Sequence, residues 1–204
     1  MGDQDAIHVM LAGEVADELA FSQALIQRRS RRNFVKRAVA EKPFWRLLGM
    51  IAAGFSRRNP AHYPWGAGLG CGFVVGDKMP LDPGFYRFTH DGCRYGQVLA
   101  GTDVGAMASA CLEQRWLSAA GLQFVFLSAP ARCDRLHGPR GYRYAMLNAG
   151  RLGQLVYLGA TALGLGACGI GAFFDDEIRS LLDLPGGEAP LYLVAAGAVK
   201  SRVM

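Results

Sequence analysis

The spacing of apolar residues along the chain predicts a mixture of helices and strands. Apolar positions recur every three or four residues, the helical period, in 14–28, 41–53, 103–120 and 141–165. A shorter helix is predicted at "DDEIRSLLDL", which has acidic residues in its first turn. Apolar runs typical of strands are "CGFVV", "GFYRF", "LQFVFLSA" and "APLYLVAAGAV". Because helices and strands do not alternate regularly, the predicted fold class is α+β.

Two glycine-rich stretches predict loops. "SRRNPAHYPWGAGLG" has no periodicity and contains two prolines. "GLGACGIG" follows the longest predicted helix and reads as a helix end that continues into a loop. A dinucleotide-binding glycine motif would instead follow a strand and begin a helix, so no Rossmann or Walker site is predicted.

The stretch from Leu152 to Phe174 contains no charged residue and is long enough to cross a bilayer. It also contains six glycines and the polar residues Gln154 and Thr161. This composition favours a buried helix over a membrane span, so no membrane association is expected.

The 204 residues suit one folded domain over residues 1–204, since 51% are hydrophobic and only 19% are charged. The five cysteines are scattered and form no CxxC pair, which argues against a disulfide framework or a metal site. Reduced thiols and an acidic N-terminal segment, unlike a signal peptide, favour a cytoplasmic protein.

The net charge of +5 is concentrated in "RRSRRNF", directly after the first predicted helix. In an extended segment, alternate residues share a face, so Arg28, Ser30 and Arg32 can bind one phosphate. A solvated surface and a nucleic-acid patch are the alternatives, and the absence of interleaved aromatics argues against nucleic acid. Lys200 and Arg202 reach the same phosphate if the last strand lies beside this segment. Otherwise they belong to an ordinary charged tail.

The later half of the chain carries a longer pattern. It reads "RGYRYAMLNAGRLGQLVYLGATALGLGACGIGAFFDDEIRSLLDL". This run resembles the nitroreductase superfamily, and within it the SagB-type dehydrogenases, at residues 140–150, 162–166 and 170–176. Together with "RRSRRNF", "HYPWGAG", "GFYRF" and the terminal "KSR", the resemblance covers residues 20–202.

The resemblance implies a central, mainly antiparallel sheet flanked by helices, in an intertwined homodimer with FMN at the subunit interface. It assigns the first basic segment and the C-terminal cations to the phosphate and ribityl chain. It assigns the residues around Gly171 to the flavin N5 and a loop around Trp65 to the flavin of the other subunit. The cofactor-binding residues that it implies are Arg28, Arg29, Ser30, Arg32, Pro64, Trp65, Gly66, Ile170, Gly171, Ala172, Lys200 and Arg202.

The chain departs from this family at several positions. Trp65 replaces a serine, Arg151 a histidine and Ala172 a glycine. Leu136-His137 stands where azoline-oxidising members carry a Lys-Tyr pair. His137 is therefore a candidate catalytic base, because imidazole titrates near neutral pH, although a lone loop histidine is often merely exposed. Tyr142 is a second candidate, with packing at a helix start as its alternative role.

The implied activity is that of an FMN-dependent oxidoreductase. The leading expectation is a dehydrogenase or oxidase of thiazoline- or oxazoline-like heterocycles in a peptide or carrier-bound intermediate, with other biosynthetic enzymes as partners. One alternative is an NAD(P)H-dependent reductase of nitro compounds, quinones or flavin. Another is a non-catalytic flavoprotein-like scaffold in a biosynthetic complex.

Overall fold

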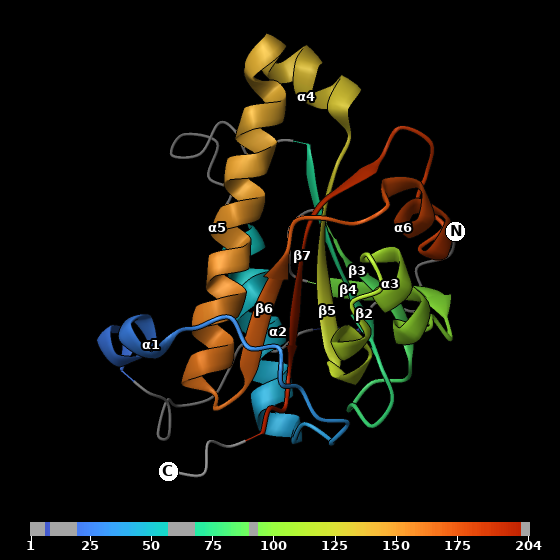
Figure 1. Cartoon of the computed structure of the whole chain (residues 1–204). Coiled ribbons are helices and arrows are strands. Elements are labelled where there is room, and N and C mark those ends of the chain that lie inside the picture. The colour runs from blue at the N-terminus through green and yellow to red at the C-terminus, as the bar shows by residue number, and fades with distance from the viewer. Residues whose placement is uncertain (1–6, 9–19, 57–67, 90–93, 201–204) are drawn as a thin grey trace.

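A computed structural model describes residues 7–8, 20–56, 68–89 and 94–200. Its strands form one sheet in the order β1-β4-β3-β2-β5-β7-β6, and every neighbouring pair runs antiparallel (Figure 1). The strands are β1 (Ile7–His8), β2 (Leu69–Val75), β3 (Gly84–Phe88), β4 (Arg94–Ala100), β5 (Leu122–Ser128), β6 (Gly166–Ile170) and β7 (Ala189–Gly197). The α+β class and the antiparallel central sheet are thus confirmed.

Helices cover both faces of this sheet. They are α1 (Phe21–Gln27), α2 (Glu41–Ser56), α3 (Val104–Ala110), α4 (Pro130–His137), α5 (Gly141–Ala162) and α6 (Asp175–Leu181). Helices α2 and α5 share one hydrophobic core with the sheet, and α3 and α6 share the other. The central strand β5 supplies both cores, because Phe124 points into the first and Val125 into the second. Its mostly apolar sequence, in which every residue is buried, reflects burial on both faces.

The helix predicted over 103–120 is interrupted. Helix α3 ends at Ala110, and a separate 3-10 helix follows at Arg115–Ala119. Between them, Leu112 and Glu113 adopt left-handed φ angles of 58° and 56°. Neither residue is a glycine, asparagine or proline, so the sequence gives no ordinary signal of this break.

The loop predicted at "GLGACGIG" is wrong, because Gly166–Ile170 is the edge strand β6 and pairs with β7. The glycines here serve close packing. A Cβ on Gly169 would collide with the hydroxyl of Tyr192, and one on Gly166 would collide with Val199. This strand places Gly171 directly at the end of a sheet edge.

Strands β1 and β4 and helix α4 were also not predicted. Pro130 occupies the first turn of α4, where its missing N–H costs nothing, and Gly138 follows its end with a φ of 59°. His137 is therefore the last residue of a helix, which corrects its expected place in a loop.

The remaining expectations hold in part. The helix predicted over 14–28 is described only as α1, which buries Ala24, and residues 9–19 lie outside the described part. The stretch 152–174 divides between α5, strand β6 and their connections rather than forming one buried helix. Among the described residues, no helix is long and apolar enough to span a membrane.

Candidate functional site

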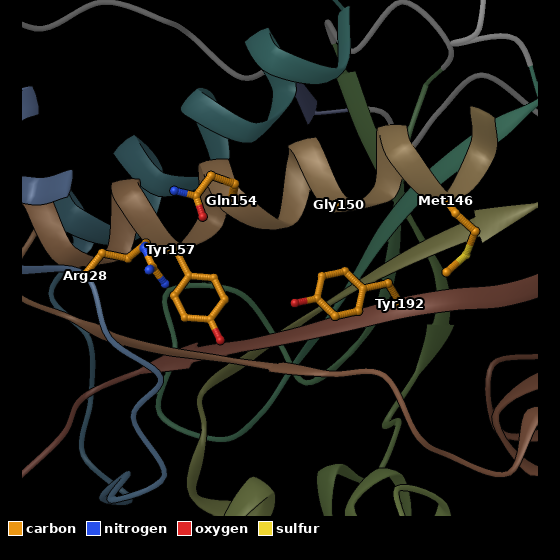
Figure 2. Close-up of a pocket in the computed structure, with 6 residues that line it drawn as sticks. All are labelled: Arg28, Met146, Gly150, Gln154, Tyr157 and Tyr192. Atoms are coloured by element: carbon orange, nitrogen blue, oxygen red, sulfur yellow. The ribbon is translucent and has the colours of Figure 1, made fainter. Parts of the chain in front are cut away.

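A pocket of about 420 Å³ lies beside helix α5, within the size range of small-molecule sites. Met146, Gly150, Gln154 and Tyr157 recur at helical spacing and so present one face of α5 to it. Tyr192 of β7 and Arg28 complete the lining, and Figure 2 shows the Tyr192 hydroxyl directed toward Tyr157, whereas the Tyr157 hydroxyl points from α5 toward strand β6. The pocket thus joins a helix, the sheet and the basic segment, which is defined here as residues 28–34.

The basic segment is fixed to the sheet by its backbone. Ser30 forms a parallel bridge with Ala167 of β6, and the Arg31 N–H donates to the Ala167 carbonyl at 2.8 Å. Farther along, the Lys200 N–H donates to the Asn33 carbonyl at 3.1 Å. Lys200 and the basic segment, which come from opposite ends of the chain, therefore lie side by side.

Tyr157 connects this segment to β6. Its hydroxyl oxygen accepts a hydrogen bond from the Gly169 N–H at 2.6 Å and lies 2.8 Å from Ser30 Oγ. The guanidinium carbon of Arg28 lies 5.4 Å from the centre of its ring, a cation–π distance. Sequence reasoning missed Tyr157, because its contacts with Ser30 and Gly169 leave no local pattern in the sequence.

The cations of the segment diverge. Arg28 lines the pocket, whereas Arg29 and Arg31 line a separate hollow of about 480 Å³ at the end of α5. Arg32 lies over the ring of Trp116, with 5.8 Å from its guanidinium carbon to the ring centre. Among the described residues, none of the four forms a salt bridge, so their charge is available to an anion.

The residues expected near the flavin N5 follow β6. Ile170 is buried at the end of the strand, while Gly171 and Ala172 are exposed. A Cβ added to Gly171 would meet no atom within 4 Å, so its backbone faces open space. The Phe174 N–H donates to the Ala110 carbonyl at 2.8 Å. This hydrogen bond anchors the end of the loop between β6 and α6.

Neither candidate acid–base residue lines the pocket. The ring of His137 packs edge-on against Tyr144 at 5.5 Å, and its buried Nε2 has no hydrogen-bond partner among the described residues. Tyr142 is 54% exposed and lies one helical turn before Met146 on α5. Of the two candidates, Tyr142 therefore lies on the same face of α5 as the residues that line the pocket.

Arg151, which departs from the family histidine, has a packing role. Its Nη2 donates to the Gly54 carbonyl of α2 at 3.0 Å. Four expected cofactor contacts cannot be located, because Pro64, Trp65, Gly66 and Arg202 lie outside the described residues.

Tyr192 brings a neutral donor to the pocket. Burial first, and then the neighbouring Tyr157 and Cys168, raise the pKa of the Tyr192 hydroxyl above its ordinary value. It stays protonated at neutral pH and can donate a hydrogen bond to a ligand. No cluster of metal-ligating side chains occurs among the residues that the structure covers.

Known proteins resemble the chain over most of its length. A protein of Methanocaldococcus jannaschii, named as a candidate nitroreductase, is 29% identical over 188 residues, which are 89% of this chain and 92% of that protein. A solved structure of a candidate nitroreductase from Anabaena variabilis superposes with a TM-score of 0.78 at 23% identity. That match covers 96% of this chain but only 42% of the larger protein.

Two more distant structures share the fold. NADPH:FMN oxidoreductase from Vibrio harveyi, complexed with NAD⁺, has a TM-score of 0.60 at 16% identity, with 90% of this chain and 73% of that chain covered. The microcin synthetase McbBCD complex of E. coli, with truncated pro-MccB17 bound, has a TM-score of 0.67 at 15% identity over 98% of this chain and 80% of that chain. The model of the nitroreductase family matches residues 81–198, more than half of the sequence, and the chain belongs to that family.

Proposed function

We propose that the chain is an FMN-dependent oxidoreductase, with one FMN-binding domain over residues 1–204. One observation carries this proposal. Arg28 and Tyr157 line the pocket beside α5, and the Tyr157 hydroxyl contacts both Ser30 and Gly169 of β6, the strand that ends directly before the exposed Gly171. A phosphate-bearing ligand with a flat ring fits this arrangement.

The donors present suit FMN. Arg28 and Ser30 offer a guanidinium and a hydroxyl, the groups that bind a phosphate through charge-assisted hydrogen bonds. The open space beside Gly171 admits a planar ring against the backbone. FMN, when bound, supplies hydride transfer, whereas this chain's residues bind the cofactor, orient it and limit water around it.

We propose further that the chain is a SagB-type dehydrogenase or oxidase of a thiazoline- or oxazoline-like heterocycle in a peptide or carrier-bound substrate. The sequence pattern supports this, and so does the likeness to a microcin synthetase complex. Of the two candidate bases, Tyr142 is favoured over His137 in a reaction at this pocket, because it lies on the same helix face as Met146.

The second candidate function is an NAD(P)H-dependent reductase of nitro compounds, quinones or flavin. The family favours it, and so does the likeness of the fold to that of the NADPH:FMN oxidoreductase from Vibrio harveyi.

The purified protein should be yellow and show the absorption bands of oxidised flavin. Under anaerobic conditions in a stopped-flow instrument, the dehydrogenase should keep the bands of oxidised flavin after NADH or NADPH is added, because its flavin takes hydride from the heterocyclic substrate and not from a nicotinamide. Rapid bleaching would establish the reductase instead. A protein that binds FMN but turns over no substrate would be the scaffold.

We propose a homodimer as the working form. Large apolar side chains are exposed on α1 and α5, with Phe21 at 71%, Ile26 at 81% and Leu147 at 62% exposure. An apolar surface of this kind typically marks an interface. Light scattering should give twice the mass of the 204-residue chain. The Leu147→Asp variant should shift the population towards monomer, whereas Val98→Asp, an equally simple change on the exposed side of β4, should not.

A further inference from the structure

We infer that Tyr157 is a positioning residue that holds Ser30 in the orientation needed to donate to a phosphate. The inference rests on the proposed FMN site. It concerns how the basic segment is held beside β6, the strand that ends directly before Gly171.

The hydroxyl of Tyr157 lies where three elements meet. The ring comes from α5, the Gly169 N–H from β6, and the Ser30 hydroxyl from the basic segment. In the sheet, β6 is an edge strand, so an N–H on its outer side has no further strand to pair with. Tyr157 therefore satisfies a backbone donor and, through the same oxygen, connects it to Ser30.

The chemistry of the groups fixes the first of these hydrogen bonds and leaves the phenol proton for the second. A backbone N–H only donates, so the Tyr157 oxygen accepts from Gly169. The phenol proton is then free for Ser30 Oγ, 2.8 Å away. When Ser30 accepts this proton, its own hydroxyl hydrogen must point elsewhere. The direction that remains open is toward a ligand oxygen, because Ser30 is exposed.

The ring of Tyr157 restrains the other phosphate ligand as well. Arg28 packs over that ring, with its guanidinium carbon 5.4 Å from the ring centre. Removing the hydroxyl alone leaves this contact in place. The effect of the hydroxyl can therefore be measured apart from the effect of the ring.

The test is a double-mutant cycle on FMN affinity, measured by quenching of flavin fluorescence in the full-length apoprotein. Tyr157→Phe should weaken FMN binding about two- to tenfold, the loss expected for one net hydrogen bond. Ser30→Ala should weaken it at least as much. If Tyr157 acts through Ser30, the double variant should bind FMN nearly as well as Ser30→Ala alone.

Tyr86→Phe is the matched control. Tyr86 is buried like Tyr157, and its hydroxyl donates to the Asp82 carbonyl at 2.9 Å, but it lies on β3, outside the pocket lining. Its FMN affinity should equal that of the wild type, and thermal melting of each apoprotein reports any general loosening of the fold.

The outcomes are distinct. An FMN affinity unchanged by Tyr157→Phe, or losses that multiply in the double variant, would overturn the inference while leaving the FMN proposal standing. A wild-type protein that binds no FMN would overturn both.

Discussion

Gly171→Val should lower turnover by about a hundredfold or more, while the protein remains folded. A Cβ at this position meets no atom within 4 Å, so the substitution causes no clash in the protein itself. The valine side chain would instead fill the open space against which the flavin ring is proposed to lie. Displacing reacting groups by about 1 Å can cost about a hundredfold in rate. The measurement is steady-state turnover, together with the thermal melting of the apoprotein.

Gly186→Val is the matched control for that substitution. Gly186 is also exposed, and a Cβ there also meets no atom within 4 Å, but it lies in the turn before β7. This variant should turn over at the wild-type rate. Full activity in Gly171→Val would place the flavin ring away from the end of β6.

The parts of the fold that were predictable from sequence are those whose signal is local and repeated. Helix α5 spans Gly141–Ala162, close to the predicted 141–165, because its small and apolar residues recur at the helical period over six turns. The buried strands β5 and β7 were recognised for a similar reason, since burial on both faces leaves long apolar runs.

The elements that were missed depend on distant partners. "GACGI" forms a strand because it pairs with β7, and Gly169 within it leaves room for the Tyr192 side chain. The break after α3 rests on left-handed backbone at Leu112 and Glu113, to which their residue types give no clue. Local pattern cannot report packing against residues that are far away in sequence.

The candidate site was predicted unevenly. The sequence placed the two cationic clusters together on condition that the last strand lies beside the first segment, and the Asn33–Lys200 contact meets that condition. It could not show that Arg28 and Arg29 face different hollows, because side-chain direction depends on the exact course of the backbone. It gave no reason to select Tyr157, whose role depends on two long-range hydrogen bonds.

The second large effect is expected for Arg28→Ala, which should weaken FMN binding about ten- to a hundredfold. A hydrogen bond to a charged group contributes about 1.5–3 kcal/mol, and each 1.4 kcal/mol is a factor of ten in affinity. Arg28 lines the pocket with no carboxylate partner among the described residues, so its charge is free for the phosphate. Titration of the apoprotein with FMN, followed by flavin fluorescence, measures the loss.

The Arg29→Ala variant distinguishes a direct arginine–phosphate contact from a general electrostatic effect of positive charge. The two arginines are adjacent in sequence and carry the same charge, but Arg29 lines the hollow at the end of α5. Through solution at physiological salt, a charge more than about 8 Å away is largely screened, so a non-contacting arginine should have a small effect. If Arg28 binds the phosphate directly, Arg29→Ala should cost threefold or less, roughly the value of a surface charge. Equal losses in the two variants would mean either that the phosphate lies between both side chains or that only net charge matters. Repeating the titrations at high salt distinguishes these cases, because a field effect disappears with screening and a direct contact persists.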